Sequence, residues 1–209
     1  MSNFTFNYYK LMLENSLLSG YKITPLKEYK LNYDKHILLR HDVDFTLENA
    51  VNFSKIENEL GIKSTYFIRL HAKNYNPLTI NNSKLLYNFL ELGHEIGLHI
   101  EPDYYKNMGL NPIEHINIEI NMLEKVLGIK MNGISTHEPS RCGYIIDKEN
   151  IKQVNVDYEA YLIDGYKYIS DSGARWREGD LNEWNNKVDK IIVNTHPVWW
   201  FKETPLENY

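Results

Sequence analysis

Short apolar runs alternate with segments of helical periodicity along most of this chain, and that alternation limits the folds open to it. Strand-length runs lie at residues 36–44, 63–70, 94–101, 133–137, 166–171 and 189–196, with a further strand expected near 158–164. Helices are predicted at 7–20, 46–60, 82–92 and 111–128. Apolar strands without clean polar alternation, separated by helices, are typical of a parallel sheet covered by helices. About seven strands, without a dinucleotide-type glycine-rich turn, favour an α/β barrel over an open sheet.

Two of the predicted helices begin with recognisable capping residues. Thr46 is expected to be the N-cap of the helix at 46–60, because its hydroxyl can accept from a free backbone N–H of the first turn. Asn111 has the same role before 111–128, and Pro112 suits the first turn of that helix.

Length and composition narrow the class of protein. The chain has 209 residues, which suits one domain, 1–209, with residues 1–30 as an N-terminal helical or extended segment packed on the barrel. The formal net charge is −5 and the basic residues are scattered, which argues against a nucleic-acid partner. Cys142 is the only cysteine, which excludes an intrachain disulfide and a thiolate zinc site. No run approaches the ~18 apolar residues of a membrane span, and no signal-peptide pattern is present, so we expect a cytoplasmic location.

Polar side chains follow the predicted strands at their C-terminal ends. A single Asp or His at such a position is usually a cap or a turn former. Here they recur at one edge, and in parallel α/β barrels that edge carries the active site. The residues concerned are Asp42, Asp44, Arg69, His99, Glu101, His137, Asp171 and His196.

Strand parity groups some of these residues further. Asp42 and Asp44 share one face with Arg40, and His99 shares a face with Glu101. Two carboxylates so close repel each other unless a cation lies beside them. Arg40 is one candidate cation, and a divalent metal held by Asp44 and His99 is another. Nitrogen and oxygen ligands suit Zn²⁺ but also Co²⁺, Ni²⁺ and Mn²⁺, so we expect a divalent transition metal, with Zn²⁺ as the first choice.

Several stretches, in order over residues 37–200, resemble the motifs of the polysaccharide deacetylases of the NodB-homology class, which are metal-dependent carbohydrate N-deacetylases. RHDVDFTLENA resembles the first motif in its HDVD-type branch, ELGHEIGLH the second and NTHPVWW the last. STHEPS and SDSGARW stand where the third and fourth motifs would be. The resemblance implies an incomplete (β/α)7 barrel, which agrees with the strand count.

The resemblance also implies roles for four of the residues. Asp42 would be the catalytic base, and His196 the general acid that protonates the leaving amine. Asp44 and His99 would be metal ligands. The third motif lacks its usual arginine in the same form, so Arg141, Arg175 or Arg40 would keep the base ionised instead.

The third protein ligand of the metal stays open at this point. Typical members have a second histidine four residues after the first, whereas His99 is followed here by IEPD. His137, from the neighbouring strand, is favoured. Glu101 has the right parity and is the next choice, and Asp103 has the family spacing.

The resemblance also implies an activity. We expect a metal-dependent hydrolase that removes an N-acyl group, acetyl in the first instance, from an amino sugar or a sugar-containing precursor in surface polysaccharide biosynthesis. A nucleotide sugar and a lipid-linked precursor are the two kinds of precursor considered. The alternatives are a catalytically silent carbohydrate-binding barrel and a hydrolase of a non-sugar C–N bond. The residues expected to bind substrate are Arg69, Asp171, Arg175, Trp176 and Trp199.

Overall fold

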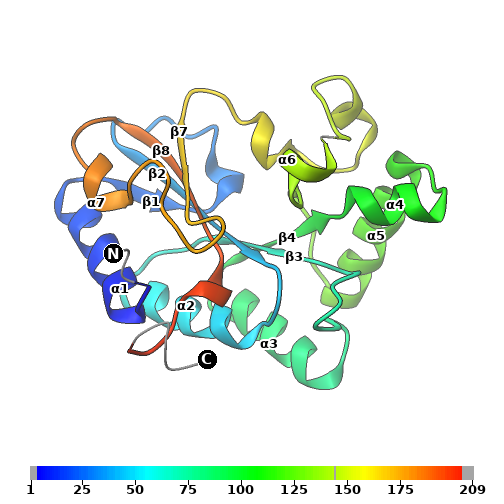
Figure 1. The fold of residues 1–209 in the computed structure, drawn as a ribbon, viewed down its shortest axis with the longest axis horizontal. Helices are drawn as coiled ribbons and strands as arrows, with labels where there is room; N and C mark the ends of the chain where they lie inside the picture. Colours follow the sequence, from blue (N-terminus) through cyan, green and yellow to red (C-terminus); the bar gives the residue numbers. More distant parts are fainter. Residues whose placement is uncertain (1–3, 144, 204–209) are drawn as a thin grey trace.

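A curled sheet of parallel strands forms the centre of the molecule, and helices pack on its outer face (Figure 1). The computed structural model describes residues 4–143 and 145–203. The strands follow one another in space in the order β6, β5, β4, β3, β2, β8 and β7, and β1 pairs with β2. No pairing joins β6 to β7 among the described residues, so the sheet is an incomplete (β/α)7 barrel, as predicted.

Six strands keep close to the predicted ranges, whereas the strand expected near 158–164 is only the two residues of β6, followed by a 3-10 turn. The strands are β1 Lys22–Thr24, β2 His36–Val43, β3 Thr65–Ile68, β4 Glu95–Ile100, β5 Gly133–Thr136, β6 Tyr158–Glu159, β7 Lys167–Ser170 and β8 Lys190–Thr195. The α-helices are α1 Phe6–Leu18, α2 Glu48–Glu59, α3 Ile80–Glu91, α4 Pro102–Met108, α5 Pro112–Leu127, α6 Pro139–Cys142 and α7 Leu181–Trp184. Short 3-10 turns lie at Leu26–Glu28, Asn150–Gln153, Ala160–Leu162 and Pro197–Trp199. The sequence patterns did not predict β1, α4, α6 or α7.

The two expected helix caps have different outcomes. Asn111 caps α5, since its side chain accepts a hydrogen bond from the backbone N–H of Glu114, and Pro112 opens the helix. Thr46 was predicted to cap α2, and this was wrong. The N-cap is Leu47, which has no side-chain capping bond. Leu47 is completely buried, so the core contact of this leucine, and not a hydroxyl cap, determines where α2 begins.

Strand parity separates an inner and an outer core. Inside the barrel, Phe67 and Tyr158 fill the space that Gly97 and Gly133 leave open. A Cβ atom at Gly133 would lie 2.0 Å from the Tyr158 ring, so this position requires glycine. The outer face of β2 carries Ile37, Leu39 and Val43, which pack in the main core with residues of α1, α2 and α3. Alternation along each strand therefore sends side chains of even number in β2 towards the barrel interior.

A buried polar network lies on the outer side of β2, beneath the helices. Glu57 of α2 is fully buried, and its carboxylate accepts hydrogen bonds from the hydroxyls of Tyr9, Ser64 and Tyr66 at 2.5–2.8 Å. His41 Nε2 lies 2.8 Å from the same carboxylate, and His41 Nδ1 lies 2.7 Å from the hydroxyl of Thr195. The network therefore links α1 and α2 to the ends of β2 and β8.

Candidate metal centre and active site

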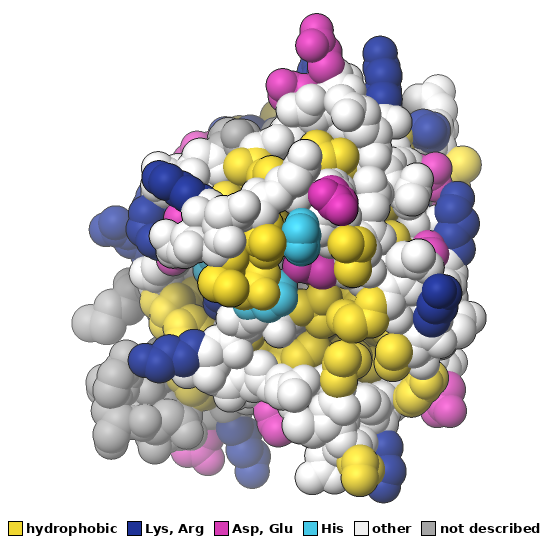
Figure 2. Space-filling model, turned by 90° about the vertical axis from the view of Figure 1, so that its right-hand side faces the viewer, with side chains coloured by type: hydrophobic (Ala, Val, Ile, Leu, Met, Phe, Trp, Pro, Cys, Tyr) yellow, Lys and Arg dark blue, Asp and Glu magenta, His cyan; other side chains and the backbone are white. Residues whose placement is uncertain are grey.

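The C-terminal ends of the strands surround a cavity of about 630 Å³. Its walls include five of the residues expected to do chemistry: Asp42, Asp44, His99, His137 and His196. On the face shown in Figure 2, histidine and acidic side chains lie together among hydrophobic ones, and the lysines and arginines lie towards the margins.

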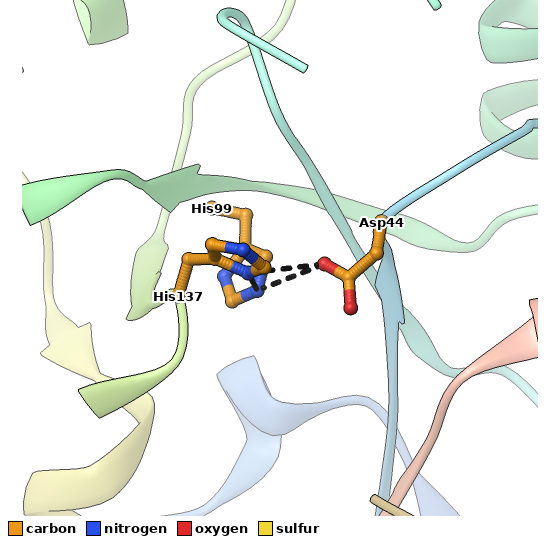
Figure 3. Close-up of side chains that lie close together, drawn as sticks. All are labelled: Asp44, His99 and His137. Carbon is orange, nitrogen blue, oxygen red and sulfur yellow. Dashed lines mark hydrogen bonds and ion pairs between the residues drawn. The ribbon is translucent and has the colours of Figure 1, made fainter. Parts of the chain in front are cut away.

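Asp44, His99 and His137 form a cluster suited to a metal ion. One ligand atom from each lies within 4.8 Å of the others. In Figure 3 the two imidazoles converge on one carboxylate oxygen, Asp44 Oδ1, at 3.5 Å from His99 Nε2 and 3.2 Å from His137 Nδ1. The neighbouring strands β4 and β5 bring the two histidines to the same edge.

The surroundings of this cluster fit a divalent metal. Asp44 Oδ1 is buried and has no hydrogen-bond donor among the described residues. His99 donates its Nδ1–H to the carbonyl of Ser135 at 2.8 Å, which leaves the lone pair of Nε2 directed at Asp44. Burial lowers the pKa of His99, so the ring is neutral and able to act as a ligand. A backbone partner that orients a ligating imidazole in this way is usual in metal sites. Two imidazoles and one carboxylate are a common ligand set for Zn²⁺.

Glu101 and Asp103, the alternative third ligands, lie outside this cluster. The Glu101 carboxylate is bound by the guanidinium of Arg69 and by the backbone N–H of His71 at 2.9 Å. Asp103 lies on α4 and pairs with Arg141 at 2.8 Å. Both carboxylates therefore already have cationic partners.

Asp42 is held as an ionised carboxylate. Burial alone would raise its pKa, but the adjacent Arg40 guanidinium holds the pKa well below its usual range. Arg40 donates to both carboxylate oxygens, with Nη2 at 2.6 and 2.8 Å, and Asn194 donates to Oδ2 at 2.9 Å. The Arg40 guanidinium also lies over the rings of Phe67 and Tyr161, at 4.8 and 4.9 Å from their centroids. Of the three arginines considered for this role, it is Arg40 that contacts Asp42.

His196 faces the same cavity as Asp42, but it carries a proton where Asp42 does not. Its Nε2 lies 3.9 Å from Asp42 and 3.9 Å from Asp44. Its Nδ1–H donates to the buried carboxylate of Asp171 at 2.6 Å, and Asp171 also accepts from the indole of Trp200 at 2.7 Å. Burial opposes protonation of His196, but the Asp171 carboxylate outweighs it and raises the pKa of His196 to about 9. The imidazole is therefore a cation at neutral pH.

Only some of the residues expected to bind substrate line the cavity. Arg69 and Trp199 line the cavity, whereas Asp171, Arg175 and Trp176 do not. Asp171 lies behind His196, and Trp176 packs against Trp200 with ring centroids 6.4 Å apart.

Sequence reasoning missed several residues that shape the site. Asn194 and Ser135 each lie two positions before a site histidine, and alternation along β8 and β5 puts them on the same face. That parity could have identified both. Tyr161 and Tyr168 also line the cavity. Tyr161 lies in a 3-10 turn after β6, where no strand period predicts its direction, and Tyr168 lies in β7 with the opposite parity to Asp171, the candidate residue of that strand.

No protein-family model matches the sequence, and no curated protein matches it either. Solved structures do resemble this one. A family 4 carbohydrate esterase from Bacillus anthracis has a TM-score of 0.53 at 14% identity and covers 95% of this chain and 81% of its own. The deacetylase PplD of Streptococcus pyogenes, in complex with acetate, has a TM-score of 0.53 at 13% identity, with 80% and 74% covered.

A third similar structure is a mutant of a CE4 family pseudoenzyme with restored enzymatic activity, whose wild-type form comes from Bacillus anthracis. It has a TM-score of 0.53 at 15% identity and covers 78% of this chain, which spans 57% of that protein's length. These likenesses establish the fold, which is that of the polysaccharide deacetylases.

Proposed function

We propose that this chain, which has the fold of the polysaccharide deacetylases, is a metal-dependent hydrolase that removes an N-acyl group, acetyl in the first instance, from an amino sugar. The observation that carries the proposal is one arrangement of side chains. A cluster suited to a metal, Asp44 with His99 and His137, lies beside an ionised carboxylate and a cationic imidazole. These are Asp42 and His196, and His196 Nε2 lies 3.9 Å from the carboxylates of both Asp42 and Asp44. Amide hydrolysis needs a base that takes a proton from water and an acid that protonates the leaving amine, and these two residues would supply them.

A divalent metal held by Asp44, His99 and His137 would act as a Lewis acid on the acyl carbonyl and make water a stronger acid. Asp42 accepts the proton of the attacking water, and its salt bridge to Arg40 keeps it in the ionised form that a base needs. His196 donates its Nε2 proton to the departing nitrogen, while Asp171 holds the other ring nitrogen. Arg40 and Asp171 therefore set the opposite protonation states that the base and the acid need.

The substrate we propose is an amino sugar or nucleotide sugar used in surface polysaccharide biosynthesis in the cytoplasm. The aromatic wall of the cavity, which includes Trp199, Tyr161 and Tyr168, supports a sugar, because ring C–H faces stack well on aromatic side chains. Zn²⁺ is the metal we propose, since the ligand set is the one it commonly takes.

The first experiment is metal analysis of protein purified without chelator. We expect about one equivalent of a divalent transition metal in the wild type and none in Asp44→Ala, because a two-histidine, one-carboxylate site loses its only charged ligand. Asp103→Ala is the matched control, since this aspartate lies outside the cluster. Loss of metal in Asp103→Ala, with retention in Asp44→Ala, would show that the ligand assignment is wrong.

A second variant separates the base from the ligands. Asp42→Asn should keep the metal and lose release of acetate from N-acetylated sugars. A catalytically silent sugar-binding barrel would instead bind these sugars in wild-type form without turnover. We favour the enzyme because both the ionised carboxylate and the protonated imidazole are present.

A further inference from the structure

The charges on the cavity wall are nearly all neutralised by partners. Among the described residues, three arginines line the cavity: Arg69, Arg141 and Arg177. Arg69 is bound to the carboxylate of Glu101. Arg141 contacts two carboxylates, those of Asp103 and Glu138. The positive charges of Arg69 and Arg141 are therefore already compensated by carboxylates, and neither arginine is available to bind an anionic ligand.

Arg177 differs from them. It lies on the loop between β7 and α7, is exposed, and makes no ion pair or hydrogen bond with any residue that the structure describes. Its guanidinium lies over Gly173, where an added Cβ would be 3.9 Å from Nη2 of Arg177. Gly173 also lines the cavity and has no side chain to screen the guanidinium.

Glu178, the acidic residue next to Arg177 in the sequence, already has a cationic partner. Glu178 lines the same cavity, but its carboxylate is bound by Lys167. At the cavity floor, Arg40 neutralises Asp42, and a divalent metal would more than neutralise Asp44. The metal-loaded cavity therefore holds an uncompensated positive charge on the side of the β7–α7 loop.

We propose that Arg177 binds an anionic group, a phosphate or a carboxylate, that the amino-sugar substrate carries in addition to its acylamino group. The inference rests on the proposed function and narrows it to acidic amino sugars. A guanidinium suits either group, because its donors form paired hydrogen bonds to two oxygens. The partially enclosed cavity makes such a contact stronger than one on an open surface.

The test uses a neighbouring arginine as its control. Arg175 lies on the same exposed loop but does not line the cavity. Zinc-loaded wild type, Arg177→Gln and Arg175→Gln would each be assayed on N-acetylglucosamine, N-acetylglucosamine phosphate and N-acetylglucosaminuronic acid. The first sugar is neutral, and the other two separate phosphate from carboxylate recognition.

We expect KM in the wild type to be roughly threefold to tenfold lower for an anionic sugar than for the neutral one, the range of a partly screened charged contact. Arg177→Gln should bring this ratio close to one, and Arg175→Gln should leave it unchanged. Equal KM values in the wild type, or an equal loss in both variants, would overturn the proposal while leaving the deacylase intact.

Absence of turnover on all three sugars would instead count against the proposed function, and calorimetry then tests the anion site by itself. Binding of the sugar phosphate or the uronic acid that is weakened by Arg177→Gln but not by Arg175→Gln would support the anion site. Equal binding in all three proteins, or no binding, would reject it.

Discussion

At the scale of single residues, the site depends on two side chains, Asp42 and His196, that are held in opposite charge states. Asp42 and His196 both face the metal cluster, yet each has a different partner behind it. Arg40 donates to Asp42 and favours the carboxylate, while Asp171 accepts from His196 and favours the imidazolium. Environment, and not residue type alone, therefore sets the opposite charge states of the proposed base and the proposed acid.

The Asp171→Asn variant tests this assignment through the pH profile. A general acid must be protonated, so kcat/KM falls as the pH rises through the pKa of His196, which is raised to about 9 in the folded protein. Without the Asp171 carboxylate, burial dominates and the pKa of His196 falls. We therefore expect the descending limb of the pH–rate profile to move to lower pH. A bound metal lowers the pKa in both proteins and leaves the direction of the difference unchanged.

Asp164→Asn removes the same charge from an exposed aspartate outside the cavity wall, and it serves as the control for altered net charge in this assay. A limb at the same pH in wild type and Asp171→Asn would show that His196 is not the titrating acid.

At the scale of elements, β2 serves two purposes on its two faces. Its inner face carries Arg40 and Asp42, and its outer face carries His41, which joins the network around Glu57 of α2. The inner residues do the proposed chemistry, and the outer network fixes the strand against its helices. Thr195, the residue before His196, is part of the same network through His41.

Glu57→Ala should strongly destabilise the protein. The carboxylate is fully buried, and its removal leaves His41 and three hydroxyls without their acceptor. Breaking a buried charged network of this kind costs about 3–5 kcal/mol. Glu59→Ala, two residues along the same helix, is the control, because Glu59 is exposed and its one ion pair among the described residues is with Lys10 at the surface. Chemical denaturation of both variants compares their free energies of unfolding, and equal stability would contradict a structural role for the network.

At the scale of the whole molecule, the two ends of the described chain close the outer layer together. The backbone N–H of Phe6 donates to the carbonyl of Phe201, and that of Phe201 donates to Phe4, both at 2.9 Å. Trp200 packs against Tyr9 of α1 and Phe53 of α2, and its indole reaches Asp171. Among helices of the described segments, none has the length and apolar character needed to cross a membrane.

We propose that residues 1–30 are an integral part of a single domain 1–209. A chain starting at residue 21 would lack α1, whose Tyr9, Met12 and Leu13 are buried in the main core. Each such side chain contributes about 1.5–3 kcal/mol when buried, which together is a large part of the stability of an ordinary domain. We expect the full chain to unfold in one calorimetric transition and the shortened chain to show none. A shortened chain that melts cooperatively at the same temperature would make α1 an accessory segment.

The sequence by itself determined the class of fold and the edge at which the unusual residues meet. Strand runs, helix periods and the alternation of side chains are local properties, so 36–44 and 189–196 were located to within one residue at either end. The same alternation put Asp42 and Asp44 on one face of their strand, and the structure turns that face towards the cavity. Short elements such as β1 and α4 were missed, because so few residues show no period of their own.

Only the tertiary structure decided which neighbours each charge has. Spacing left three candidates for the third position of the metal cluster, and the pairing of β4 with β5 brings His137, not Glu101 or Asp103, beside His99. It also selected Arg40 over Arg141 and Arg175 as the partner of Asp42, and placed Arg177 on the cavity wall. The physical reason is that a buried charge is compensated by whichever group the packing brings within hydrogen-bond distance, and sequence separation does not determine that distance.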